Sequence, residues 1–300
     1  MSTDVLPPYV SILAPSFHGA TTLSVLLNNH PQLVSLGDNN PPRRFEHHNC
    51  TCGLEIRYCE FWAGLQAELA EFSATGSDAW FPTRPNITGR FDRTDSLLVL
   101  ALQAAGAGGV VQSAAGRLQP FREFRRYLSA FARHVLVKSG KGIFVDGEKS
   151  VTKYVAANLS GYHPKGAIHL IRDPRAYVAS SIRIGSTLDA SAAEWRRYHR
   201  RLLHATARGP VPILRLHYEA LTTDPVSSMK LVFNFLGVAH HDIFFRPTPE
   251  QFWHQTGNRT VLQFNGYISD EEKWRHELSA KQSARVLRLA GSLARDFGYL

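Results

Sequence analysis

Small and hydroxyl-bearing residues from Gly19 to Thr22 follow the apolar run 9–14 and open a second apolar segment that stops near Pro31. Small residues let a backbone approach a phosphate, and the free N–H groups of a first helical turn point toward it. The two threonine hydroxyls add further donors. The pattern predicts an anion-binding loop between a strand and a helix. The alternative is a tight turn in which the threonines only cap the helix.

The loop is poorly suited to ATP. A Walker-type loop, G-x-x-x-x-G-K-[ST], uses its lysine for the β- and γ-phosphates and its hydroxyl for Mg²⁺. The run Gly19-Ala20-Thr21-Thr22 supplies hydroxyls but no lysine. We therefore expect the loop to hold one phosphate group rather than ATP with magnesium.

A second anion site is predicted where the apolar run 167–171 ends on Arg172. Asp173 and Pro174 are typical of the N-cap and first position of a helix. Ser180 follows Arg172 by eight residues, two turns into that helix, so a guanidinium and a hydroxyl can share a phosphate. The alternative is that Arg172 pairs with a carboxylate and Ser180 only packs.

Strand-like and helix-like segments alternate along the chain, which predicts an α/β fold with a mainly parallel sheet. The expected strands are 9–14, 35–38, 142–146, 167–171 and 211–216. The expected helices include 61–72, 95–105, 120–137, 190–208, 225–236 and 279–297. Ligands of such sheets bind beyond the carboxyl ends of the strands, and the candidate polar residues fall at those ends.

The composition favours a globular protein with an anionic ligand. The chain has 300 residues, 44% apolar and 20% charged, and a net charge of +9. We treat residues 1–300 as a single domain in which 39–145 supplies an acceptor-binding and lid region. The positive excess is spread along the chain, which favours a small polyanion over nucleic acid.

The chain shows no signal peptide and no predicted membrane span. The longest uncharged run, 96–116, contains glutamines and several glycines and is too polar to cross a bilayer. The three cysteines are clustered within ten residues, unlike a secreted disulfide framework. We therefore expect a cytoplasmic protein.

These motifs together resemble the sulfotransferases that use 3′-phosphoadenosine-5′-phosphosulfate (PAPS). In that family a loop after the first strand binds the 5′-phosphosulfate. The matching residues here are His18, Gly19, Ala20, Thr21 and Thr22. A strand that ends in arginine, with serine eight residues on, binds the 3′-phosphate, and Arg172 and Ser180 match that spacing.

Two further segments resemble the family in the same order. The run around Tyr218 is similar to a Tyr-Glu-Asp-Leu motif whose tyrosine lies by the adenine. A late His-x-x-Gly-Asn motif is matched from His254 and implies that Asn258 and Arg259 contact the cofactor. The resemblance implies a three-layer α/β/α fold of the P-loop NTPase type and a role in secondary metabolism.

The chain departs from the family at His18, where a lysine or arginine is usual, and at Ala20, where glycine is usual. The family's cation assists the bridging oxygen as the sulfuryl group leaves. His18 can do so when protonated or as an N–H donor. Lys149, which follows the strand ending at Asp146, is a possible substitute; the alternative is a solvent-facing lysine.

The acceptor group needs a general base, and Asp38 is the first candidate. Asp38 follows the second predicted strand, where related members place an acid. His18, His47 and His48 are rivals. The alternative is that Asp38 is a surface residue of a turn.

The cysteines Cys50, Cys52 and Cys59 follow His47 and His48. Three thiolates and an imidazole can hold zinc. The C-x-C-x₆-C spacing is uncommon in zinc fingers, so we favour reduced or locally bridged thiols and predict no metal site.

The predicted activity is transfer of a sulfuryl group from PAPS to a hydroxyl or amine of a small-molecule acceptor. The expected ligands are PAPS and its bisphosphate product, with no required metal, no nucleic acid and a homodimer as the candidate assembly. The alternatives are a P-loop nucleotide or small-molecule kinase and a non-catalytic anion-binding protein on the same fold.

Overall fold

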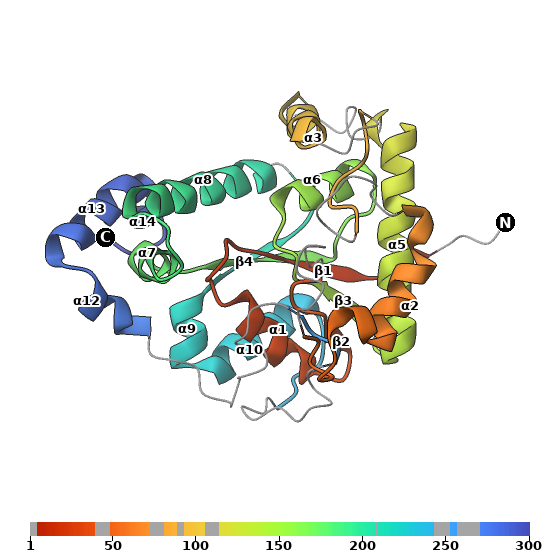
Figure 1. The fold of residues 1–300 in the computed structure, drawn as a ribbon, viewed down its shortest axis with the longest axis horizontal. Helices are drawn as coiled ribbons and strands as arrows, with labels where there is room; N and C mark the ends of the chain where they lie inside the picture. Colours follow the sequence, from red (N-terminus) through yellow and green to blue (C-terminus); the bar gives the residue numbers. More distant parts are fainter. Residues whose placement is uncertain are drawn as a thin grey trace.

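A five-stranded parallel sheet forms the centre of the protein (Figure 1). The computed structural model describes residues 5–39, 49–72, 81–88, 93–105, 114–207, 209–242, 253–256 and 271–300. The strands are β1 (Tyr9–Leu13), β2 (Leu33–Ser35), β3 (Ile143–Asp146), β4 (Gly166–Ile171) and β5 (Ile213–His217). Their order is β2-β3-β1-β4-β5, and every neighbouring pair is parallel. The order brings the ends of β1, β3 and β4 together in the middle of the sheet.

Helices cover both faces of the sheet, so the fold is three-layered (Figure 1). One face carries α1 (Ala20–Asn28), α9 (Tyr218–Thr223) and α10 (Pro225–Leu236). The opposite face carries α2 (Glu60–Glu68), α5 (Gln119–Ser139), α6 (Val151–Leu159) and α8 (Leu188–Thr206). The α/β architecture predicted from the alternating segments is confirmed.

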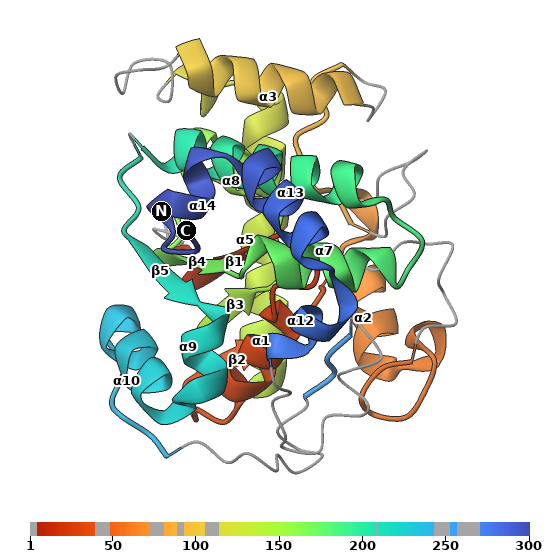
Figure 2. The ribbon, with the colours of Figure 1, turned by 90° about the vertical axis from the view of Figure 1, so that its left-hand side faces the viewer.

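The remaining helices extend these layers. A third apolar cluster joins α7 and α8 to the C-terminal helices (Figure 2). Besides α8, the helices of this cluster are α7 (Pro174–Ile182), α12 (Trp274–Glu277), α13 (Ala280–Ala290) and α14 (Ser292–Asp296). The other elements are α3 (Arg93–Ala105) and the 3₁₀ turns η2 (Ile56–Tyr58), η3 (Ala70–Phe72) and η5 (Glu271–Lys273).

Strand β1 shows why the sheet is buried on both sides. Successive side chains of a strand point to opposite faces. Tyr9 and Leu13 join the core beneath α5 and α6, whereas Val10 and Ile12 join the core beneath α1 and α10. All five residues of β1 are buried, as expected for a strand between two helical layers.

The second strand differs from the prediction, which placed it at 35–38. The structure places β2 at Leu33–Ser35. Gly37 has a φ of +69° and leaves the strand path, and it forms an isolated parallel bridge to Thr256. The correction matters for the site, because Asp38 lies on the turn after β2 rather than within the strand.

The predicted C-terminal helix is divided in two in the structure. The final helix, predicted over 279–297, is broken at Gly291, which has a φ of +70° and separates α13 from α14. Residues 81–88, the described part of a stretch between 75 and 93 that is rich in Gly, Pro, Asn and Asp, hold no helix or strand.

Helix caps and the edge strand agree with the sequence. The Asp173 carboxylate accepts a bond of 2.7 Å from the Arg175 N–H and caps α7, with Pro174 at its first position. Asp224 caps α10 in the same way. Strand β5, which follows Pro212, lies at one edge of the sheet, a position that tolerates proline. Among the described helices, none is both long enough and apolar enough to cross a membrane.

Candidate active site

The N-terminus of α1 forms the predicted anion-binding loop. Gly19 is its N-cap residue with a φ of +79°, and among the described residues no side chain caps the helix. The first bond of the helical ladder joins the Leu23 N–H to the Gly19 carbonyl at 2.9 Å. The N–H groups of Ala20, Thr21 and Thr22 precede that bond and so have no acceptor within the helix. The loop therefore presents three donors and the positive end of a helix dipole to one place.

Tyr218 packs directly on Gly19. A β-carbon at position 19 would lie 2.0 Å from Cε2 of the Tyr218 ring, so only glycine fits here. The Arg172 guanidinium lies 5.1 Å from the centroid of the same ring and donates a hydrogen bond to the Phe17 carbonyl. The ends of β1, β4 and β5 thus bring the loop, Arg172 and Tyr218 together, as the sequence predicted.

Ser180 lies on α7 and is buried. Its hydroxyl accepts a bond of 2.9 Å from Nη2 of Arg183, and Arg183 also pairs with Glu277 at 2.8 Å. Arg183 was not predicted as a site residue. Its position three residues after Ser180, on the same face of the helix, is the sequence signal that points to it.

His18 is completely buried and points into the core rather than toward the loop. Its Nδ1 lies 2.9 Å from the Ser16 carbonyl, and its Nε2 lies 3.3 Å from Nε2 of His199 on α8. His199 Nδ1 in turn lies 2.9 Å from Nε2 of His169 on β4. The three rings form one hydrogen-bonded chain.

The Ser16 carbonyl fixes the protons of this chain, because a carbonyl can only accept. His18 Nδ1 donates to it, so His18 Nε2 accepts from His199, and His199 Nδ1 accepts from His169. Burial, with the nearby Arg172 charge, lowers the pKa of His18 to about 3. Burial likewise lowers the pKa of His169 to about 3.

The predicted role of His18 as a catalytic cation is therefore corrected. A neutral, enclosed imidazole whose two nitrogens are both occupied provides no positive charge to a leaving oxygen and no base to an acceptor. Its side chain instead holds the loop against β4 and α8. The backbone of His18 remains part of the loop.

Asp38 and Lys149 lie together at the carboxyl ends of β2 and β3. Lys149 Nζ is 3.1 Å from Oδ2 of Asp38, and the Asp38 side chain is 39% exposed, so a ligand can reach it. Lys149 has a φ of +66°, an unfavourable region for lysine. The Tyr198 hydroxyl donates a bond of 2.6 Å to the Lys149 carbonyl and helps to hold that backbone.

Close backbone contacts position the pair. A β-carbon at Gly147 would lie 2.1 Å from the Gly37 carbonyl oxygen, and one at Gly37 would lie 2.3 Å from the Thr256 carbonyl oxygen. The Asp38 N–H donates to the Thr256 carbonyl at 3.1 Å, and the Thr256 hydroxyl donates to the Asp38 carbonyl. Glycine at both positions therefore lets three chain segments meet next to Asp38.

A buried charge cluster lies beside Lys149. Lys153 Nζ pairs with Asp146 at 2.9 Å and with Glu148 at 2.6 Å, and Asn39 donates to Asp146 at 3.1 Å. Burial raises the pKa of Glu148 to about 7, against the opposing effect of Lys153. Sequence reasoning assigned no role to Glu148 or Lys153, because Asp-Gly-Glu-Lys-Ser after a strand is also typical of a solvated turn.

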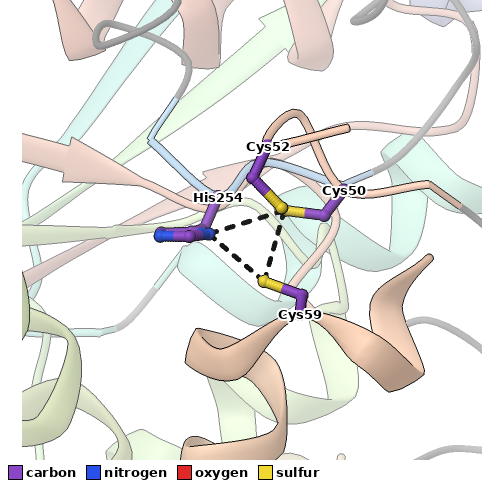
Figure 3. Close-up of side chains that lie close together, drawn as sticks. All are labelled: Cys50, Cys52, Cys59 and His254. Carbon is purple, nitrogen blue, oxygen red and sulfur yellow. Dashed lines mark hydrogen bonds between the residues drawn. The ribbon is translucent and has the colours of Figure 1, made fainter. Parts of the chain in front are cut away.

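Cys50, Cys52 and Cys59 gather around His254 (Figure 3). One donor atom from each of the four lies within 4.8 Å of every other. The sequence had paired these cysteines with His47 and His48, which lie outside the described residues, as do Asn258 and Arg259. The assignments of those four residues remain predictions.

A family model described as "Sulfotransferase family" matches residues 111–242. That span contains β3, β4, β5 and both predicted 3′-phosphate residues, Arg172 and Ser180. Over that span, which is less than half of the chain, the sequence is similar to the sulfotransferase family. No curated protein matches the sequence.

A solved sulfotransferase domain shares the fold. The sulfotransferase domain of the Synechococcus PCC 7002 olefin synthase superposes with a TM-score of 0.53 at 20% identity, covering 96% of this chain and 94% of that one. Sulfotransferase STF9 from Mycobacterium avium gives a TM-score of 0.49 at 12% identity, covering 98% and 78%. At this level of identity the olefin synthase domain shows that the sulfotransferase architecture extends over nearly the whole chain.

Proposed function

We propose that this protein is a sulfotransferase that transfers the sulfuryl group of PAPS to a hydroxyl or amine of a small-molecule acceptor. The observation that carries the proposal is the convergence of Arg172 and Tyr218 on the uncapped N-terminus of α1. A helix start with free N–H groups suits the 5′-phosphosulfate, and the guanidinium and Ser180 suit a second phosphate. A flat ring beside both suits an adenine.

The proposed chemistry is in-line displacement at sulfur. Charge develops on the bridging oxygen of the leaving bisphosphate, so fixed donors at that oxygen stabilise the transition state most. Because His18 is neutral and enclosed, the proposed donors are the loop N–H groups and the Lys149 ammonium. Lys149 uses one N–H on Asp38 and has two further donors to offer.

Asp38 is the proposed general base. Its carboxylate is accessible, and its backbone is fixed on both sides by Thr256. In this assignment the acceptor hydroxyl gives its proton to Asp38 as its oxygen bonds to sulfur, while the S–O bond to the bisphosphate breaks. Such a base contributes roughly 10²- to 10⁴-fold in rate.

Residues between 39 and 145 are the proposed source of the acceptor pocket. A hollow of about 290 Å³ lies wholly within this region. It is lined by aromatic, proline and charged side chains from η3, the segment 81–88 and α5, among them Phe72, Arg84, Phe124 and Tyr127. Its mixed lining suits an acceptor with an apolar body and polar substituents. We further propose a cytoplasmic location, in keeping with the three cysteines, all within the described residues, none of which forms a disulfide.

Ligand-induced thermal stabilisation tests the nucleotide part of the proposal. Adenosine 3′,5′-bisphosphate is expected to raise the melting temperature more than adenosine 5′-monophosphate or ATP with Mg²⁺ does. Arg172→Ala is expected to remove most of that increase, and Arg117→Ala, at an exposed arginine, to preserve it. A larger effect of ATP with Mg²⁺ would instead indicate a kinase.

Turnover tests the chemical part. The protein is incubated with PAPS and a panel of phenols, alcohols and amines, and release of the bisphosphate is followed with each acceptor. Acceptor-dependent release would support the proposal. Tight bisphosphate binding without turnover of any acceptor would favour the non-catalytic alternative.

A further inference from the structure

The cluster of Cys50, Cys52, Cys59 and His254 has the dimensions of a tetrahedral metal site (Figure 3). Zinc bound at about 2.3 Å to sulfur and about 2.1 Å to nitrogen separates two sulfurs by about 3.8 Å and a sulfur from a nitrogen by about 3.6 Å. Sγ of Cys50 and Cys59 are 3.8 Å apart. Nδ1 of His254 lies 3.6 Å from Cys50 Sγ and 3.3 Å from Cys59 Sγ.

The backbone around the first two cysteines is folded to aim both sulfurs at one point. The Cys50 carbonyl accepts the Gly53 N–H at 2.9 Å, which closes a tight turn, and Gly53 has a φ of +92°. The Cys50 N–H donates to the Leu54 carbonyl at 2.8 Å, next to an antiparallel bridge between Asn49 and Glu55. Cys59 then enters at the start of α2.

His254 is held in an unusual conformation that turns its ring toward the sulfurs. Its φ is +46°, a strained value for a residue other than glycine. Its ring stacks on Phe61 with 4.8 Å between centroids, and its carbonyl accepts the Trp62 indole N–H at 3.1 Å. Both of these contacts come from the helix that follows Cys59, so the histidine and the cysteines are positioned by one local assembly.

We propose that these four residues bind one Zn²⁺ in a structural site. Three thiolates and an imidazole are the soft donors that select zinc, and four protein ligands leave no open position for substrate. The thiols lose their protons to solvent as they bind, so three thiolates and one divalent ion leave a net charge of −1. This assignment replaces the expectation that the chain holds no metal.

The site would tie together two segments that lie 195 residues apart in sequence, Cys59 and His254. A second contact joins the same segments, because the Thr51 N–H donates to the Gln255 carbonyl at 3.1 Å and the Thr51 hydroxyl accepts the Gln255 N–H at 2.9 Å. Thr256, next along the chain, binds the Asp38 backbone. The zinc thereby positions Asp38 without touching it. The proposal stands independently of the sulfotransferase reaction.

Metal content of the purified protein is the direct test. The chain is expressed without an affinity tag in zinc-supplied cells, and elemental analysis is expected to find about one zinc per chain. Replacement by Co²⁺ is expected to give the intense thiolate charge-transfer and tetrahedral ligand-field bands of a sulfur-rich site. Neither measurement depends on enzyme activity.

Variants separate the cluster from adventitious binding. Cys52→Ser changes the exposed cysteine and is the variant least disruptive to packing. It is expected to retain the fold by circular dichroism and to lose zinc at least tenfold faster to a chelator. His254→Ala is expected to lose zinc as well, whereas His163→Ala, at an exposed histidine, keeps it.

Three outcomes would overturn the proposal. The first is wild-type protein that is folded and free of zinc, with Cys50 and Cys59 joined in a disulfide by mass spectrometry. The second is iron in place of zinc. The third is unchanged zinc content and unchanged chelator kinetics in folded Cys52→Ser and His254→Ala, which would mean an ion bound elsewhere.

Discussion

Lys149 Nζ lies 3.1 Å from Oδ2 of Asp38, although the two residues are 111 positions apart in the chain. Each follows one of two neighbouring parallel strands, β2 and β3, so the pair lies at the carboxyl edge of the sheet. Gly37 and Gly147 touch through their backbones immediately before the two side chains. The pair therefore combines an acid and a cation in one place, with a geometry set by the backbone.

The first prediction is that Asp38 and Lys149 act as one unit in turnover. Asp38→Asn keeps the shape of the side chain and removes the base, so kcat should fall roughly 100-fold or more. Lys149→Met removes the cation, and kcat should fall by about 100-fold. The double variant should lose little more than the worse single variant, because residues that act together are not additive. Steady-state kinetics with PAPS measures all three.

Lys138→Met is the matched control, because Lys138 is an exposed lysine on α5. Bisphosphate affinity, measured by calorimetry, should stay close to that of the wild type in Asp38→Asn and in Lys138→Met. Full activity in Lys149→Met would exclude Lys149 from the chemistry. Multiplication of the two single effects in the double variant would show that the residues act separately.

A second prediction concerns Gly19. Gly19→Ala would place a β-carbon 2.0 Å from the Tyr218 ring and force an alanine to a φ of +79°. The ring must move away from the loop, so bisphosphate affinity should fall more than tenfold. The same calorimetric titration measures this change. The double variant Gly19→Ala/Tyr218→Ala should have a higher free energy of unfolding than Gly19→Ala, because the clashing ring is absent.

Gly140→Ala is the control for the cost of placing alanine at a positive φ without a steric clash. Gly140 has a φ of +67°, and a β-carbon there would meet no atom within 4 Å. The substitution should cost about 1 kcal/mol of stability and leave bisphosphate affinity unchanged. Equal effects of the two alanine variants on affinity would mean that the close packing of Tyr218 on Gly19 has no part in binding.

Local patterns carried most of the fold prediction. The apolar run before Gly19 and the Asp173-Pro174 pair each specify a strand end or a helix start within a few residues, and the structure confirms both. The break at Gly291 was missed because the amphipathic pattern continues through it. The position of β2 was missed because the predicted strand began at Ser35 and omitted Leu33 and Val34, whereas Gly37, with its φ of +69°, turns the chain out of the strand before Asp38.

The environment of the side chains was harder to predict, because it depends on distant residues. Whether His18 faces the ligand or the core is decided by His199, which lies 181 residues later on α8. The partner of the cysteines, His254, lies 195 residues from Cys59. One sequence gives no local signal for such contacts. Lys153 was missed for a related reason, since only the fold shows that its two carboxylate partners are buried.

A third prediction is that Lys153 is required for stability. Its ammonium compensates Asp146 and Glu148 in a buried site. Lys153→Met leaves two buried carboxylates without their cation, which should reduce the free energy of unfolding by about 3–5 kcal/mol at pH 8. Urea denaturation measures the loss. The deficit should shrink as the pH falls, because protonation of the carboxyls removes the uncompensated charge, and a deficit independent of pH would point to lost packing instead.

The last prediction is that the buried histidine chain makes the protein sensitive to mild acid. The pKa values of His18 and His169 are lowered to about 3, and burial lowers the pKa of His199 well below its ordinary value. The unfolded chain therefore binds more protons below about pH 6.5 than the folded one does, so stability falls as the pH falls from 6.5 toward 3. Each histidine contributes up to about 1.4 kcal/mol per pH unit in that range.

Glu148 opposes this trend, because its carboxyl group binds one more proton in the folded chain than in the unfolded chain. Its pKa of about 7 means that the folded state holds a proton between pH 4.5 and 7 that the unfolded state has released. From these four groups alone, three histidines against one carboxyl leave a net loss of stability of roughly 3 kcal/mol per pH unit on acidification. Urea denaturation at intervals from pH 6.5 to 5 gives the slope. His169→Gln should reduce this slope by about 1.4 kcal/mol per pH unit, the contribution of one proton. His204→Gln, at an exposed histidine, should leave the slope unchanged. An unchanged slope in His169→Gln would mean that the buried chain does not control the acid sensitivity.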